Sequence, residues 1–227
     1  MIILGLTGSI GMGKSTATAM FRRLRVPVFD ADAAVHALQR PGGRALPAIE
    51  AAFPGTTGPT GLDRQKLGAI VFADRAALKR LEAIIHPMLN RVRRHWLSTQ
   101  ALHRQPLVVL DVPLLFETGG DRRCDAVAVV SAPAHVQRQR VLARPGMTAE
   151  KFAHILKTQL PDAAKRRRAD FVIPSGQGKL PTLVAIRRLL RALDGLPARH
   201  WPPGLPGGRR PGTAVIRNKV RRNKVTP

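Results

Sequence analysis

The sequence contains few acidic residues, few aromatic residues and almost no cysteine. Of its 227 residues, 14 are Asp or Glu, 38 are Lys or Arg, and none is Tyr. The single Cys124 excludes an internal disulfide, and no second Cys or clustered His gives it the spacing of a metal site. We therefore expect Cys124 to be a small buried apolar side chain. The scarcity of aromatic residues disfavours a stacking platform for single-stranded nucleic acid.

Long hydrophobic runs are also absent. No apolar stretch approaches the roughly 20 residues that a membrane-spanning helix needs. The first six residues lack the basic region and the length of a secretory signal. We therefore expect a cytoplasmic protein with no membrane partner, whose 44% apolar residues suffice for one α/β domain with a tail or an insertion.

The net charge of +24 needs an explanation. Residues 198–227 carry +8 and residues 1–197 carry +16, so the body of the protein is itself basic. Charge of this size can indicate a nucleic-acid partner, which would bind in a strongly salt-dependent way. It is also compatible with polyphosphate substrates and an Arg-rich composition, and we do not expect nucleic acid to be the main partner.

Short apolar runs alternate with helical periodicity, which predicts a three-layer α/β domain with a central parallel sheet. The expected strands are residues 2–6, 26–29, 107–110, 126–130 and 171–173, and the expected helices of this body are residues 15–24, 134–143, 149–156 and 180–193.

Two segments interrupt or extend this pattern. Residues 34–103 read as a mostly helical insertion, in which Asp63 and Asp74 are expected N-caps and Pro87 suits the first turn of a helix. From residue 196 the composition changes to Pro, Gly and Arg, which predicts a basic, disordered tail over 196–227.

The strongest motif is Gly-Ser-Ile-Gly-Met-Gly-Lys-Ser at residues 8–15, which matches G-x-x-x-x-G-K-[ST] between an expected strand and an expected helix. In such a loop the backbone N–H groups surround the β-phosphate, Lys14 reaches the β- and γ-phosphates, and Ser15 ligates Mg²⁺. An accidental Gly-rich turn is the alternative. The motif predicts a P-loop NTPase fold that binds ATP with Mg²⁺.

Three carboxylates follow expected strands. Asp30 and Asp32 come after the second strand, where either one can accept a proton from an attacking hydroxyl or cap the next helix, which we expect to begin near Ala33. Asp111 ends the third strand, as a Walker-B aspartate does, and is a candidate to hold Mg²⁺ directly or through water.

If the γ-phosphoryl group is transferred to a hydroxyl, the protein is a kinase, and a kinase commonly places positive charge on a lid that covers the phosphates. Arg140 and Arg144 are spaced i,i+4, which places them on one face of an expected helix. The alternative is that such arginines simply form a solvent-exposed basic face of the helix, which is the more usual case. We assign that simpler role to Arg138 and to residues 165–168.

Several landmarks occur in one order and together resemble dephospho-CoA kinase through about Gly176. They are the P-loop, Val-Phe-Asp-Ala-Asp at 28–32, Ile-His-Pro at 85–87, Asp-Val-Pro-Leu-Leu-Phe-Glu at 111–117, and a lid pattern of Gln137, Arg140, Arg144 and Gln159. The acid and Asn that usually follow this family's last strand are replaced here by Pro174 and Ser175. This replacement affects the expected contacts to the adenine of ATP and not those to its phosphates.

The resemblance implies ATP-dependent phosphorylation of the ribose 3′-hydroxyl of dephospho-CoA, with dephospho-CoA and ATP as small-molecule partners. It implies catalytic roles for Lys14, Asp32 as general base and Arg140, with Asp30 as a structural partner. The ATP-binding residues would be Gly11, Met12, Gly13, Lys14, Ser15, Thr16 and Arg144, the metal ligands Ser15 and Asp111, and the substrate-binding residues Asp32, His86 and Pro87.

The expected nucleotide-binding core comprises residues 1–33, 104–132 and 168–195, with the substrate-binding insertion at 34–103 and the lid at 133–167. Two rival interpretations remain open at this point. One is a kinase for another small metabolite, which a substrate panel would distinguish. The other is a nucleotide-dependent nucleic-acid-binding protein, which only the basic charge supports.

Overall fold

The computed structural model describes residues 1–202, which belong to two compact units. The first unit contains Met1–Val28 and continues from Arg104, and the second is Phe29–His103. Residues 203–227 lie outside the described part, and with them most of the segment predicted to be a disordered tail.

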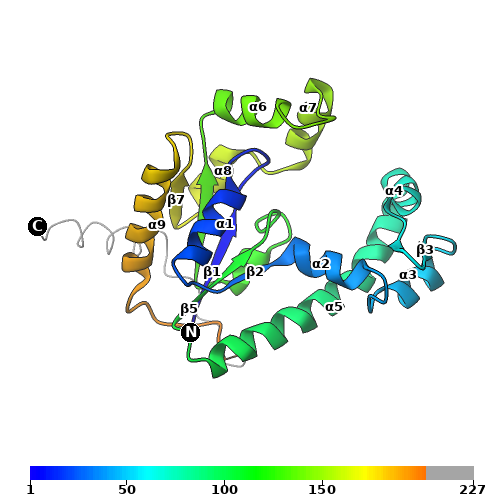
Figure 1. Ribbon diagram of the computed structural model, residues 1–227, viewed down its shortest axis with the longest axis horizontal. Helices are drawn as coiled ribbons and strands as arrows, with labels where there is room; N and C mark the ends of the chain where they lie inside the picture. Colours follow the sequence, from blue (N-terminus) through cyan, green and yellow to red (C-terminus); the bar gives the residue numbers. More distant parts are fainter. Residues whose placement is uncertain (203–227) are drawn as a thin grey trace, which may run out of the picture. The chain divides into compact units, whose positions relative to one another are not determined.

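A five-stranded sheet forms the centre of the first unit (Figure 1), with the strand order β2-β5-β1-β6-β7. The pairs β1–β5, β1–β6 and β6–β7 are parallel, with Leu4 aligned with Val109 on one side and Ala126 on the other. The strands are β1 (Ile2–Thr7), β2 (Val28–Asp30), β5 (Leu107–Asp111), β6 (Ala126–Ser131) and β7 (Phe171–Pro174). This sheet confirms the predicted fold class, and all five predicted strands are present.

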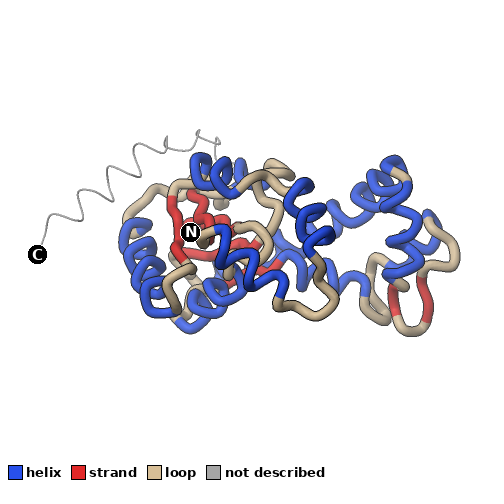
Figure 2. The backbone as a smooth tube through the Cα atoms, turned by 90° about the horizontal axis from the view of Figure 1, so that it is seen from above, coloured by secondary structure: helices blue, strands red, loops and turns tan. Residues whose placement is uncertain are grey.

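Helices flank the sheet, as the view in Figure 2 shows. The helices of this unit are α1 (Lys14–Arg23), α6 (Ala134–Leu142), α7 (Ala149–Thr158), α8 (Asp162–Arg168) and α9 (Lys179–Leu193). Apolar side chains of α1 and α9, including Phe21 and Ile186, pack on one face of the sheet against Leu4 and Leu6. Alternate strand residues face the other side, where a Cβ on Gly5 would lie 2.7 Å from Leu115.

The second unit is mostly helical and holds its own apolar core. Its helices are α2 (Ala31–Gln39), α3 (Leu46–Ala52), α4 (Arg64–Ala73) and α5 (Arg75–Leu102), and a two-stranded hairpin joins β3 (Thr57–Gly58) to β4 (Gly61–Leu62). Asp63 accepts hydrogen bonds from Gln65 N and Lys66 N, and Asp74 accepts one from Ala76 N. Both predicted N-caps are therefore confirmed.

The prediction for Pro87 is wrong. This residue lies inside the 28-residue helix α5 and not at a helix start. Proline removes one helical N–H donor, and burial of flanking side chains such as Ile85 in the core of this unit offsets that loss. The apolar spacing of Leu78, Leu81, Ile85 and Met88 runs through Pro87 without a break, and it is the signal that indicates a single helix.

Two further details differ from the sequence predictions. Helix α2 begins at Ala31, two residues before the expected start. At the other end of the chain, residues 196–202 do not all behave as a free tail, because the backbone N–H of Arg199 donates to Oδ1 of Asp125 at 2.7 Å.

Cys124 is fully buried, as expected. Its sulfur lies 3.6 Å from the carbonyl oxygen of Gly120, which begins a short 3-10 helix (Gly120–Arg123).

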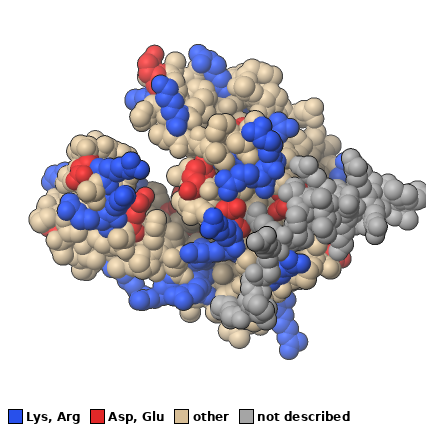
Figure 3. All heavy atoms as spheres, turned by 180° about the vertical axis from the view of Figure 1, so that it is seen from behind, with Lys and Arg blue, Asp and Glu red and all other residues tan. Residues whose placement is uncertain are grey.

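Basic side chains cover more of the face shown in Figure 3 than acidic side chains do, in keeping with the net charge of +24. Within residues 1–202, no helix has the length and apolar character needed to cross a membrane.

Candidate active site

The P-loop motif connects β1 to α1, as the sequence predicts. The loop turns back with positive φ angles of 75° at Gly11 and 79° at Gly13, a conformation that favours glycine. Gly13 is the N-cap of α1, so the helix presents its positive end and its first unpaired N–H groups directly after the turn. This local structure is suited to binding a phosphate through backbone donors.

Lys14 and Asp111 form an ion pair beside this loop. Lys14 Nζ lies 2.5 Å from Oδ1 of Asp111, which is the last residue of β5 and only 3% exposed. The buried hydroxyl of Thr18 donates to Oδ2 of the same carboxylate at 2.7 Å. The structure thus brings together two residues that are 97 positions apart, and it adds Thr18, which the sequence analysis missed.

The donor set around Asp111 can be tested against Mg²⁺, which prefers oxygen ligands and keeps several water molecules. Asp111 provides two carboxylate oxygens, and the exposed Ser15 lies one residue after Lys14. These oxygens are of the right chemical class. Within residues 1–202, no three His, Cys, Asp or Glu side chains cluster as an all-protein metal cage would require.

Two glutamine side chains hold the peptide groups of Ile10 in the P-loop. Gln137 Nε2 donates to the carbonyl oxygen of Ile10 at 2.8 Å, and the N–H of Ile10 donates to Oε1 of Gln159 at 3.1 Å. Gln137 lies on α6, and Gln159 follows the last residue of α7. The segment predicted to be a lid is therefore tied to the P-loop near both of its ends.

Arg140 on α6 contacts the loop after β7. Its Nη2 donates to the carbonyl oxygen of Ser175 at 2.7 Å, and its Nη1 donates to the Ser175 hydroxyl at 3.2 Å. That hydroxyl in turn donates to the carbonyl oxygen of Met12 in the P-loop at 2.6 Å. Ser175, one of the residues that departs from the family pattern, thus connects Arg140 to the P-loop backbone.

The predicted pairing of Arg140 with Arg144 on one helix face is wrong. Helix α6 ends at Leu142, with Ala143 as its C-cap, and Arg144 lies beyond it. Pro145 explains this end, because a residue that precedes proline is disfavoured in the helical conformation.

Lys165 is also not the solvated residue that we expected. Its side chain is fully buried, and Nζ forms an ion pair with Oε1 of Glu117 at 3.0 Å. The geometry of this pair is not that of a hydrogen bond, and Nζ has no hydrogen-bond partner among the described residues. The same oxygen accepts a hydrogen bond from the N–H of Leu160 at 2.9 Å. Burial alone would raise the pKa of Glu117, but the Leu160 N–H and the Lys165 ammonium outweigh it and hold the pKa below its ordinary value.

The Glu117 contacts support the glutamine at the end of the lid segment. Leu160 directly follows Gln159, so fixing the Leu160 backbone also fixes the position from which Gln159 reaches Ile10. Arg168, from the same predicted basic run, is half-exposed, and its guanidinium lies 4.5 Å from the ring centroid of Phe116. Residues of the 111–117 motif therefore contact α8 and the segment that leads into it.

The remaining predicted site residues lie in the second unit. Asp30 is the N-cap of α2 and accepts a hydrogen bond from Ala33 N at 2.9 Å, whereas the exposed Asp32 lies within the first turn of that helix. The two carboxylates therefore have different local surroundings. His86 and Pro87 occupy the middle of α5.

Comparisons with known proteins agree with one another. A model of the dephospho-CoA kinase family matches residues 2–179. The dephospho-CoA kinase of Novosphingobium aromaticivorans is 62% identical over 191 residues, which are 84% of this chain and 94% of the relative. That of Rhodopseudomonas palustris (strain CGA009) is 52% identical over 200 residues, covering 88% of this chain and all of the relative.

Solved structures show the same fold. TT1252 from Thermus thermophilus superposes with a TM-score of 0.71 at 37% identity, over 86% of this chain and 98% of the other. A dephospho-CoA kinase from Campylobacter jejuni superposes with a TM-score of 0.56 at 22% identity, over 83% and 95%. With the family match over most of its length, the chain belongs to the dephospho-CoA kinase family, which phosphorylates dephospho-CoA with ATP.

Proposed function

We propose that this chain transfers the γ-phosphoryl group of ATP to the ribose 3′-hydroxyl of dephospho-CoA, giving coenzyme A and ADP. The observation that carries the proposal is the P-loop turn at the start of α1, with Lys14 held against Asp111 at the end of β5. Both reactants are small molecules, and we place the reaction in the cytoplasm. Neither a membrane nor a nucleic acid takes part in it.

The backbone of residues 11–16 would bind the phosphates of ATP, and Lys14 would neutralise charge on the β- and γ-phosphates. Lys14 would have to exchange part of its contact with Asp111 for phosphate oxygens. The hydroxyl of Ser9 is buried and has no hydrogen-bond partner among the described residues. Because a buried unpaired hydroxyl is unfavourable, a phosphate oxygen at the loop would satisfy it.

Arg140 is proposed to stabilise the transferring phosphoryl group. It already lies beside the P-loop, held by Ser175, so a short side-chain movement changes its partner from a carbonyl oxygen to a phosphate oxygen. We propose that Arg144, in the loop after α6, adds positive charge to the ATP-binding side.

Ser15 and Asp111 are the residues proposed to hold Mg²⁺, with Asp111 acting directly or through a water molecule. Held by these residues, the ion would supply positive charge that offsets the negative charge on the phosphates of ATP. Thr18 would keep the Asp111 carboxylate oriented toward the loop through the hydrogen bond to Oδ2.

Asp32 is the proposed general base for the 3′-hydroxyl. Its neighbour Asp30 caps α2 and fixes the first turn of the helix, which orients Asp32. The second unit would bind dephospho-CoA, with His86 and Pro87 of α5 among its substrate-binding residues. Residues 133–167 would act as the lid, and the remainder of the first unit as the nucleotide-binding core.

The roles of the two aspartates are tested by a matched pair of variants. Asp32→Asn should lower kcat by roughly 10²- to 10⁴-fold, the usual contribution of a general base, with the KM for ATP little changed. Asp30→Asn should keep nearly full activity, because Asn is as good an N-cap as Asp. Nearly full activity in Asp32→Asn, or an equal loss in both variants, would contradict the assignment.

A further inference from the structure

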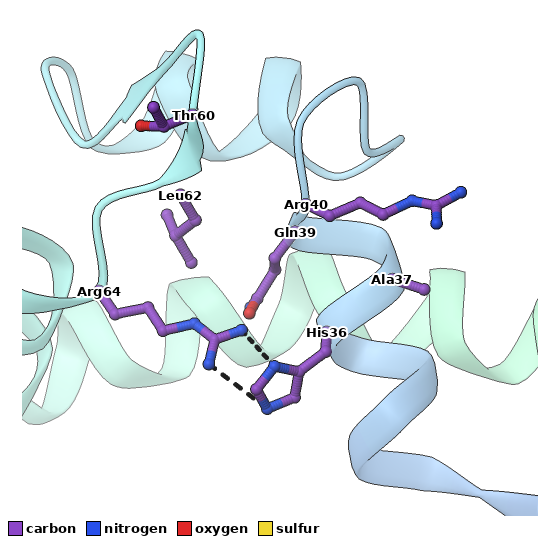
Figure 4. A pocket seen from close by; sticks show the side chains of 7 residues that line it. All are labelled: His36, Ala37, Gln39, Arg40, Thr60, Leu62 and Arg64. Atoms are coloured by element: carbon purple, nitrogen blue, oxygen red, sulfur yellow. Dashed lines mark hydrogen bonds between the residues drawn. The ribbon is translucent and has the colours of Figure 1, made fainter.

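A pocket of about 460 Å³ lies within the second unit (Figure 4). It is formed by the last turns of α2, by the β3–β4 hairpin and by the start of α4. Its lining residues are His36, Ala37, Gln39, Arg40, Thr60, Leu62 and Arg64. None of these residues has been assigned a role so far.

The close approach of the hairpin to α2 builds this pocket. Gly61, with φ of 94°, lies so near the end of the helix that a Cβ on it would be 2.8 Å from the carbonyl oxygen of Gln39. The strand that leads into the hairpin is held by Glu50, which accepts hydrogen bonds from Gly55 N at 2.7 Å and Thr57 N at 3.0 Å. The hairpin thus packs closely against the end of α2, and the segment that leads into it is fixed by the hydrogen bonds to Glu50.

The pocket carries positive charge and no acidic side chain. Figure 4 shows the guanidinium of Arg64 directed at His36 and the side chain of Arg40 directed away from Arg64, with the amide of Gln39 beside the Arg64–His36 pair. Arg64 Nη2 lies 2.5 Å from Nδ1 of His36 and Nη1 lies 3.4 Å from Nε2. An imidazole does not neutralise a guanidinium, and no acidic side chain of the described residues forms an ion pair with Arg64.

The pocket lies one helical turn from the proposed general base. Asp32, His36 and Gln39 are spaced i, i+4 and i+7 on α2, which places them on one face of the helix. One turn corresponds to about 5.4 Å along the helix axis. A substrate whose acceptor hydroxyl reaches Asp32 therefore extends readily to His36 and Arg64.

Dephospho-CoA has a group that suits this position. Its ribose carries the acceptor hydroxyl at C3′ and, on the neighbouring side of the ring, a 5′-diphosphate with two negative charges. Arginine is well suited to phosphate recognition, because its planar guanidinium donates two parallel hydrogen bonds to phosphate oxygens.

We infer that Arg64 and His36 bind the 5′-diphosphate of dephospho-CoA and that Arg40 adds positive potential at the rim of this pocket. The inference rests on the proposed function and adds to it a residue that selects a diphosphate-bearing acceptor. Arg64 exchanges its contact with His36 for the phosphate oxygens, and both side chains then donate to the anion.

The test uses Arg64→Gln, with Arg64→Lys as a conservative variant and Arg75→Gln as a matched control. Arg75 is the first residue of α5 after the N-cap Asp74, just as Arg64 is the first residue of α4 after the N-cap Asp63, but Arg75 does not line the pocket. Arg64→Gln should raise the KM for dephospho-CoA about tenfold, a size that suits a charge-assisted contact at an exposed site. The KM for ATP and kcat should change less than twofold, Arg64→Lys should recover part of the loss, and Arg75→Gln should behave as the wild type.

Adenosine separates the diphosphate contact from contacts to the nucleoside, because it keeps the 3′-hydroxyl and lacks the diphosphate. Its inhibition constant against dephospho-CoA, measured at saturating ATP, should be the same in the wild type and Arg64→Gln. An unchanged KM for dephospho-CoA, an equal rise in the KM for ATP, or an equal loss of adenosine binding would overturn the inference while leaving the kinase activity in place. Absence of acceptor-dependent turnover in the wild type would overturn the proposed function, and the inference with it.

Discussion

The buried ion pair between Lys165 and Glu117 leads to a quantitative prediction for Glu117→Gln. The substitution keeps the shape of the side chain and an oxygen that accepts the Leu160 N–H, but it removes the charge opposite a fully buried ammonium. Breaking a buried pair by neutralising one partner costs about 3–5 kcal/mol. The Glu117 side chain is 19% exposed, so water screens part of the interaction, and we expect a loss near the lower end, about 3 kcal/mol in the free energy of unfolding.

Lys165→Met provides the control. It removes the buried charge and fills the same space with an apolar side chain. Combined with Glu117→Gln it replaces both charges of the pair, a change that is often neutral or stabilising. The double variant Glu117→Gln/Lys165→Met should therefore be more stable than Glu117→Gln alone. Urea unfolding followed by circular dichroism measures all four proteins. If Glu117→Gln lies within about 0.5 kcal/mol of the wild type, as ordinary surface substitutions do, the loss of the Glu117 charge does not destabilise the fold as expected for a buried pair.

The remaining predictions concern the same unit. Replacing Gln137 or Gln159 with Leu removes one of the two hydrogen bonds that hold Ile10. In steady-state kinetics with each substrate varied, each variant should raise the KM for ATP several-fold without an equal rise in the KM for dephospho-CoA. Equal changes in the two KM values would argue against an effect on the P-loop. Ser175→Ala removes the hydroxyl that connects Arg140 to Met12. This variant should lower kcat more than it changes either KM, and Ser175→Thr should recover part of the loss. A wild-type kcat in Ser175→Ala would show that this hydroxyl does not position Arg140. Because the pKa of Glu117 is lowered in the folded state, its stabilising effect is present above the ordinary Glu pKa of 4.5 and is lost as the pH falls through the lower folded value. The stability difference between the wild type and Glu117→Gln, measured by urea unfolding, should therefore be constant near pH 7 and should shrink below about pH 4.5; a difference that grows with acid would reverse the sign of the argument.

Contiguous features were predictable from the sequence. The P-loop is specified by residues 8–15 and by an apolar run before it, both of which are local signals. Asp111 was predicted for a similar reason, since it directly ends a short buried strand. The strands themselves were predictable because both faces of the sheet are covered, which gives nearly continuous apolar sequences.

Features that depend on distant partners were not predictable. The run that contains Lys165 looks like a solvated basic face, and only the fold shows that Glu117, 48 positions earlier, lies beside its buried ammonium. The Arg140–Ser175 contact likewise joins residues 35 positions apart. The pocket beside Arg64 depends on strands of two residues each, which are too short to give an alternating pattern.

Two errors could have been avoided with signals already present. Pro145 indicates that Arg144 does not continue α6, and the apolar spacing on both sides of Pro87 indicates one long helix. For Pro87 the prediction followed a proline rule and neglected the apolar periodicity, whereas for Arg144 it followed the i,i+4 spacing of two arginines and neglected the proline rule.

The central claim is that this chain phosphorylates dephospho-CoA. The most direct test is the rate of ADP formation by the purified wild-type protein with Mg-ATP, measured with and without dephospho-CoA, together with the mass of the acceptor afterwards. The account predicts that ADP formation depends on dephospho-CoA and that one coenzyme A appears for each ADP. A folded, ATP-binding protein whose ADP formation is unaffected by dephospho-CoA, or that phosphorylates another metabolite in its place, would contradict it.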